Sequence, residues 1–176
     1  MFMNRLYKLV LSAIFLAAAI VLPFLTGQVQ QIGNALCPMH IPILLCGFFC
    51  GPWYALVIGL IAPLLRFLLC GMPPLIPIGI PMCFELATYG FVSGMAYRLL
   101  PYKKKNVYLS LIIAMLAGRV VWGLAYFVLM KMNWTSFGMA AFISGAFLNA
   151  IPGIIIQLIL IPLLVIKLKK ISRNDS

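Results

Sequence analysis

The chain has 176 residues, of which 65% are hydrophobic and only 9% are charged, and its mean hydropathy is +1.14. A soluble domain needs about a quarter of its residues charged, so this composition excludes a soluble protein and indicates an all-α polytopic membrane protein. The net charge of +11 does not indicate nucleic-acid binding, because ten of the 13 Lys and Arg residues fall in three clusters, at residues 5–8, 98–105 and 167–173. Such clusters mark the cytoplasmic side of membrane helices. A span takes about 20 residues, so we expect one domain, residues 1–176, with six transmembrane helices and both termini cytoplasmic.

The first predicted span covers residues 9–25 and enters from the cytoplasm. We do not interpret it as a secretory signal, because no polar cleavage region follows its alanine run. Ala13 and Ala17 are four residues apart and give this helix a small-residue face that another helix could approach closely. Packing inside the bundle would use the same residues, so both interpretations stand. Residues 26–40 are polar for this chain and predict an outer lid or binding loop.

The second apolar stretch, residues 41–50, predicts a helix too short to cross an average bilayer. Gly51 and Pro52 then force a break in the helix. A proline-rich outer turn is expected at residues 70–77. Cys37 and Cys70 both fall near outer ends, and whether they form a disulfide is left open. The remaining predicted spans cover residues 53–69, 78–100, 107–129 and 138–166, with bends in the last at Pro152 and Pro162.

Three fully charged side chains lie inside the predicted spans: Arg66, Glu85 and Arg119. With a helical rise of about 1.5 Å per residue, Arg66 and Arg119 lie roughly 20 and 18 Å above the cytoplasmic side. Glu85 lies roughly 10 Å below the outer side. In a hydrocarbon core of about 30 Å, all three fall at nearly one depth, in the outer half. Charge inside a span is costly and marks a functional site by default.

Three interpretations of these charges compete. In the one we favour, the arginines bind an anionic group of a solute, since guanidinium geometry matches a carboxylate or phosphate. Glu85 would then orient an arginine or accept a hydrogen bond from the solute. In the second, Glu85 pairs with one arginine to hold the bundle together, which leaves the other arginine uncompensated. In the third, Glu85 and His40 form a proton relay.

The surrounding residues suit a small pocket, which typically combines aromatic walls with few polar groups. Tyr89 is one turn from Glu85, and Asn149 lies about 16 Å below the outer start of the sixth span. Further candidate substrate-binding residues are His40 at the rim, and Trp122 with its neighbour Tyr126, which follow Arg119 at helical spacing. The sequence contains no catalytic triad, HExxH motif, metal-ligand spacing or P-loop. We therefore predict neither an enzyme nor a resident cofactor or metal, and any uphill transport needs energy from a partner.

These features together resemble the substrate-binding S component of energy-coupling factor (ECF) vitamin transporters. The first-helix pattern KLVLSAIFLAAAIVLP, with Ala13 and Ala17, looks like the small-residue motif by which S components dock the transmembrane T subunit. The stretch PMHIPILLCGFFCGPWYALVIGLIAPLLRFLLCGMPP also looks like members of this superfamily. The resemblance covers essentially the whole chain. It rests on size, six spans, cytoplasmic termini and the long first outer loop.

The resemblance implies a function in the bacterial cell membrane. An S component binds a vitamin with high affinity near the outer face, under a lid of loops. It then topples in the lipid bilayer to release the vitamin inward, driven by two ATPase subunits through the T subunit. Pocket residues do not carry over by motif. Two arginines against one glutamate favour a carboxylate-bearing vitamin such as pantothenate, nicotinate or folate. Pyridoxine, riboflavin, a pyrimidine precursor and a queuosine precursor are the alternatives left open. The alternative function is a self-contained secondary carrier or a membrane scaffold protein.

Overall fold

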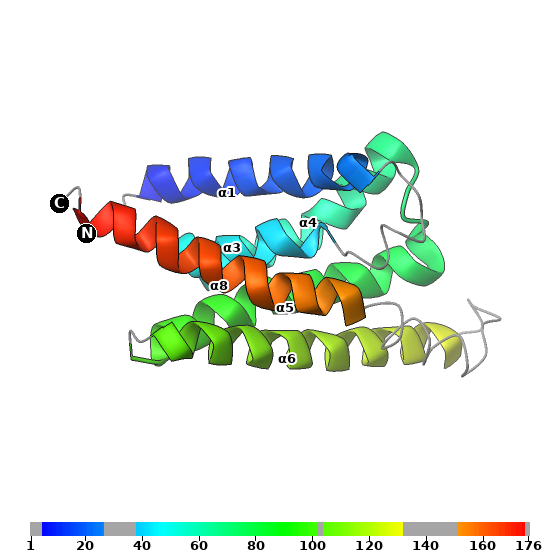
Figure 1. The fold of residues 1–176 in the computed structure, drawn as a ribbon. Coiled ribbons are helices and arrows are strands. Elements are labelled where there is room, and N and C mark those ends of the chain that lie inside the picture. The colour runs from blue at the N-terminus through cyan, green and yellow to red at the C-terminus, as the bar shows by residue number, and fades with distance from the viewer. Residues whose placement is uncertain (1–4, 27–37, 102–103, 132–150, 175–176) are drawn as a thin grey trace.

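The computed structural model describes residues 5–26, 38–101, 104–131 and 151–174 (Figure 1). These residues form helices and no strand. In chain order the elements are α1 (Arg5–Val21), η1 (Leu22–Thr26), α3 (His40–Phe49), α4 (Pro52–Cys70), η2 (Leu75–Gly79), α5 (Ile80–Leu99), α6 (Lys104–Lys131) and α8 (Ile151–Asn174).

The prediction of an all-α polytopic membrane protein is confirmed. Four stretches of the described chain are long and apolar enough to cross a membrane, and two further apolar helices are shorter. The four are Arg5–Phe24, Pro52–Cys70, Leu75–Leu99 and Lys105–Leu129, and the shorter two are His40–Phe49 and Gly153–Leu168. The start of α1 and the end of α8 lie at the same end of the bundle (Figure 1).

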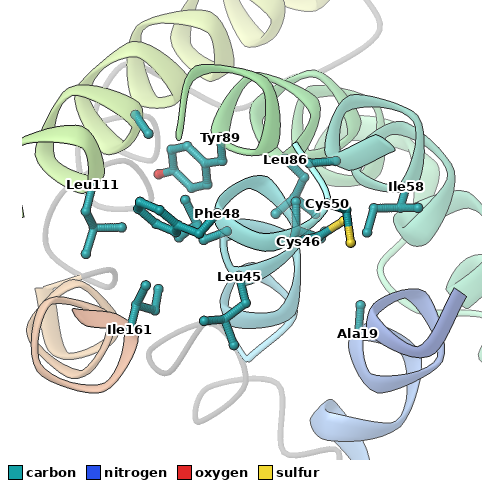
Figure 2. Packing of buried hydrophobic residues seen from close by; sticks show 14 of the residues in the cluster. Ala19, Leu45, Cys46, Phe48, Cys50, Ile58, Leu86, Tyr89, Leu111 and Ile161 are labelled. Atoms are coloured by element: carbon teal, nitrogen blue, oxygen red, sulfur yellow. The ribbon is translucent and has the colours of Figure 1, made fainter. Parts of the chain in front are cut away.

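The short helix α3 lies in the middle of the bundle, where it packs against α1, α4, α5 and α8. Eight of its 10 residues are buried. Figure 2 shows its side chains Leu45, Cys46 and Phe48 among residues of the surrounding helices. A helix shorter than the bilayer is tolerated at membrane depth when protein surrounds it. The predicted length of this helix is therefore confirmed, and its burial explains why so short a helix is tolerated in the bundle.

The break after α3 occurs where the sequence predicts it. Gly51 has a φ of 104°, a conformation that disfavours side chains other than glycine's. Pro52 begins α4, at the helix position that tolerates a missing N–H. The chain therefore reverses within two residues and sends α4 back along α3.

Close backbone contact fixes α5 against α4. A Cβ atom added at Gly90 would lie 2.6 Å from the carbonyl oxygen of Ala55, nearer than any real side chain comes. Because the obstacle is backbone, a larger residue at position 90 would force the two helices apart. This close packing places the middle of α5, and with it Glu85, inside the bundle rather than against lipid.

Several sequence predictions fall partly outside the described residues, among them the outer loop at residues 26–40. The sixth predicted span begins at residue 138, whereas the described part of α8 begins at Ile151 and contains Pro162. The predicted turn at residues 70–77 runs into η2, whose Ile76 has non-helical dihedral angles. The thiol of Cys70 is free, and Cys37 lies outside the described residues.

Candidate functional site

The carboxylate of Glu85 is the centre of a buried polar group built from three helices. Tyr89, one turn along α5, donates a hydrogen bond from its hydroxyl to Oε1 of Glu85 at 2.9 Å. Arg119 of α6 places Nη1 3.4 Å from the same oxygen. His40, at the start of α3, places Nε2 3.7 Å from Oε2. We call these four residues the Glu85 cluster; all four were predicted from the sequence as site residues.

Tyr89 is held between α3 and α6. Its ring lies 5.3 Å from the His40 ring, centre to centre, and tilted to it. On the α6 side, a Cβ atom at Gly118 would collide with Cδ1 and Cε1 of the Tyr89 ring. The absence of a side chain at Gly118 therefore leaves room for the Tyr89 ring. Because Glu85 and Tyr89 are four residues apart on α5, the Tyr89 hydroxyl can reach the Glu85 carboxylate.

The ion pair of the cluster is well shielded. The side chain of Glu85 is 4% exposed and that of Arg119 is 15% exposed. Buried charges require a partner, since the loss of hydration otherwise exceeds what the fold can tolerate. The pairing expected in the bundle-holding interpretation is thus present. The 3.7 Å between Nε2 of His40 and Oε2 of Glu85 is longer than a hydrogen bond, and a proton relay through these two residues stays a prediction.

Arg66 makes its contacts elsewhere. Its Nη1 donates to the carbonyl of Ile20 at 3.2 Å, and its guanidinium lies 5.6 Å from the centre of the Phe24 ring. Ile20 belongs to the last turn of α1, where carbonyls lack helical partners and a cation is favourable. Within the described residues, the ion pairs of Glu85 are with His40 and Arg119 and not with Arg66.

Equal depth therefore did not bring all three charges together. The arginine left over after Glu85 pairs with Arg119 is compensated by a backbone carbonyl and an aromatic face. The excess of positive charge consequently argues less strongly for an anionic solute than the sequence suggested. A solute contact by Arg66 stays a prediction.

The predicted aromatic residues of α6 lie together. Trp122 and Tyr126 are buried, and their rings stack with centres 5.2 Å apart and planes 17° apart. Trp122 follows Arg119 by three residues on the same helix, so an aromatic pair adjoins the ion pair. Asn149, the other predicted polar residue, lies outside the described residues.

Sequence reasoning missed Gln157. This residue of α8 is only 2% exposed, and its Oε1 has no hydrogen-bond partner. Both ring nitrogens of the buried His40 also lack a hydrogen-bond partner. The sequence analysis selected site residues inside the spans mainly by their full charge, and the amide side chain of Gln157 is uncharged. The available signal was a lone polar residue at helical spacing from apolar Ile161 and Val165.

A groove of about 330 Å³ lies between α4 and α5, on a different face of α5 from Glu85. Its lining is almost entirely apolar, which does not suit a water-soluble solute. The lining residues are Leu56, Leu60, Phe84, Ala87, Thr88 and Phe91. Among the described residues, no three His, Cys, Asp or Glu side chains are grouped to hold a metal ion.

The predicted docking residues lie on the outer surface of α1. Ala13 and Ala17 are exposed, whereas Ser12 and Ala19 of the same helix are buried. The small-residue face is thus not used for packing within the described bundle. This leaves it accessible to another helix.

Comparison with known proteins agrees with the resemblance drawn from the sequence. No curated protein and no solved structure matches the chain. A family model described as "ECF transporter, substrate-specific component" matches residues 7–165. This match covers nearly all of the chain and includes α1, the Glu85 cluster and most of α8. The protein therefore belongs to the family of substrate-specific components of ECF transporters.

Proposed function

We propose that this protein binds a small water-soluble vitamin or vitamin precursor at the outer side of the bacterial cell membrane and delivers it inward. Membership of the ECF substrate-specific family supports solute binding within an uptake system. The Glu85 cluster is the observation that carries the site, since it gathers buried polar groups of three helices in an apolar bundle. In this proposal six helices cross the membrane, and both termini are cytoplasmic, beside the basic clusters.

Within the proposed site, Arg119 is the cation that a solute would meet. Its planar guanidinium matches a carboxylate, and Glu85 and Tyr89 fix its surroundings. A carboxylate-bearing vitamin such as pantothenate, nicotinate or folate is therefore the preferred candidate. The stacked Trp122 and Tyr126 would supply the apolar wall that small-molecule sites require.

The identity of the solute can be tested with a panel of ligands. The purified protein would be unfolded thermally in detergent with each water-soluble vitamin and precursor in turn. A ligand at 100 times its dissociation constant adds about 2.7 kcal/mol of stability, which should raise the melting temperature by several degrees. One clear hit identifies the solute class. A flat panel would refute the assignment to vitamins.

We further propose that Ala13 and Ala17 dock the T subunit, which connects the protein to two ATPase subunits. The sequence contains no P-loop, so the energy of uptake must come from those partners. Ala13→Trp should abolish uptake in cells and leave solute binding by the purified protein unchanged, because it enlarges an exposed face far from the Glu85 cluster. The measurements are radiolabelled uptake and the thermal shift.

A matched control lies on the same helix. Ile14 is 57% exposed and lies about 100° around α1 from Ala13 and about 60° from Ala17, at the border of the small-residue face. Ile14→Trp adds a comparable ring beside this face and should reduce uptake less than Ala13→Trp does. Loss of both binding and uptake in Ala13→Trp would contradict the separation of docking from binding.

A further inference from the structure

The buried amide of Gln157 has a property that the rest of the fold does not explain. Its Oε1 has no hydrogen-bond partner although the residue is 2% exposed. Roughly 90% or more of buried polar groups in native proteins are hydrogen-bonded, so each exception needs a physical reason. Two buried serines of the described chain follow the rule. The hydroxyl of Ser110 donates to a backbone carbonyl at 2.8 Å and that of Ser93 at 3.1 Å.

Gln157 faces the interior of the bundle. Figure 2 shows Ile161, one turn further along α8, directed towards Leu111 of α6 and Leu45 of α3. These three residues belong to one buried cluster, and α8 packs on both α6 and α3. Residues four apart share a helix face, so Gln157 points towards the same two helices.

Gln157 and His40 both lie in the first third of their helices, counted from the N-terminus. Helices α3 and α8 begin at the same end of the bundle (Figure 1). Gln157 lies about 6 Å before Ile161 along α8, and His40 lies about 7.5 Å before Leu45 along α3. Two buried side chains that each have a polar atom without a hydrogen-bond partner, one on each of two packed helices, thus lie towards the same end of the bundle.

We propose that Gln157 is a solute-binding residue, which together with His40 forms a hydrogen-bonding wall of the site. The inference rests on the proposed function and deepens it by naming a second chemical feature of the solute. Oε1 of Gln157 would accept a hydrogen bond from a hydroxyl or amide N–H group. The solute class is therefore a small molecule that carries hydroxyl or amide groups, and not only a carboxylate for Arg119.

The unliganded protein provides a test that needs no known solute. Gln157→Leu keeps the approximate size of the side chain and removes the unsatisfied amide. If the amide is reserved for a solute, the substitution should raise the melting temperature of the protein in detergent by about 2–4 °C. A lower melting temperature would overturn the inference, because it would mean that the amide stabilises the fold. Gln157→Met, with a more flexible chain, repeats the test should leucine pack poorly.

Ser110→Ala is the matched control for the stability measurement. It also removes a buried polar group, but one whose hydrogen bond is made within α6. Its melting temperature should stay level or fall. A rise as large as that of Gln157→Leu would overturn the inference, since any loss of a buried polar group would then stabilise the protein.

A binding measurement separates this inference from the proposed function. The probes are pantothenate, which has hydroxyl, amide and carboxylate groups, nicotinamide, which has an amide, and nicotinate, which has only a carboxylate beside its ring. Gln157→Leu should weaken binding of a hydroxyl- or amide-bearing probe at least tenfold and spare nicotinate. Unchanged binding of such a probe would overturn the role of Gln157 and leave the proposed function standing. If the wild-type protein binds no vitamin, the proposed function fails, while a raised melting temperature of Gln157→Leu still supports an amide reserved for another polar solute.

Discussion

Removing the charge of Glu85 should destabilise the protein strongly, although it changes the shape of the side chain very little. In Glu85→Gln the amide oxygen can still accept the hydrogen bond of Tyr89, which is 2.9 Å long in the native protein. What is lost is the negative charge 3.4 Å from Arg119, whose side chain is only 15% exposed. The perturbation therefore isolates the ion pair from the packing around it.

The magnitude follows from the geometry and the burial. Two unit charges about 4 Å apart interact by about 4 kcal/mol at an effective dielectric constant of 20. Removal of one partner of a buried pair typically costs 3–5 kcal/mol, because the other charge is left without compensation. For a chain of this length, about 4 kcal/mol corresponds to a fall in melting temperature of roughly 10 °C. Arg119→Met should lower the stability by a similar amount, since Glu85 then loses its arginine partner.

A double-mutant cycle decides whether the pair is responsible. Glu85→Gln combined with Arg119→Met should be more stable than the sum of the single effects predicts, by about 2 kcal/mol or more. The measurement is thermal unfolding in detergent of the wild-type protein, both single variants and the double variant. Glu85→Gln with Arg66→Gln is the control, because these residues share no described contact and their effects should add. Additivity within about 0.5 kcal/mol for Glu85 and Arg119 would refute the reasoning.

Two further substitutions test the surroundings of this pair. Gly118→Ala should lower stability by about 1–3 kcal/mol, because the added methyl collides with the Tyr89 ring; an unchanged melting temperature would show that the ring can move aside. Arg66→Gln should lower stability by about 1–2 kcal/mol, through loss of the bond to the Ile20 carbonyl. A large loss of solute affinity in the same variant would support the predicted solute contact of Arg66, and an affinity within about twofold of the wild-type value would contradict it.

The features that the sequence predicted well are those that depend on distance along the chain. The short α3 and its end at Gly51 follow from the length of one apolar run and from local backbone chemistry. The depth of Glu85 and Arg119 follows from helical rise, and it correctly indicated that they could meet. No knowledge of helix arrangement was needed for either.

The features that the sequence predicted poorly depend on the direction in which a helix face points. Arg66 lies at a suitable depth, but α4 turns it towards the end of α1 and not towards Glu85. Only the packing of α4 against α1 and α5 determines that direction, and periodicity within an almost uniformly apolar helix does not reveal it. Gln157 was missed for a related reason. Its importance depends on whether a neighbour satisfies its amide, which is a property of the assembled bundle.

The arrangement places the proposed solute and docking functions on different helices. The Glu85 cluster uses α3, α5 and α6, whereas Ala13 and Ala17 lie on the exposed face of α1. Arg66 joins the C-terminal end of α1 to α4 by a hydrogen bond, and α4 in turn packs tightly on α5. A change at the solute site that shifted α5 would therefore reach the docking helix through α4. It would also reach α1 through α3, which carries His40 of the Glu85 cluster and packs directly on α1.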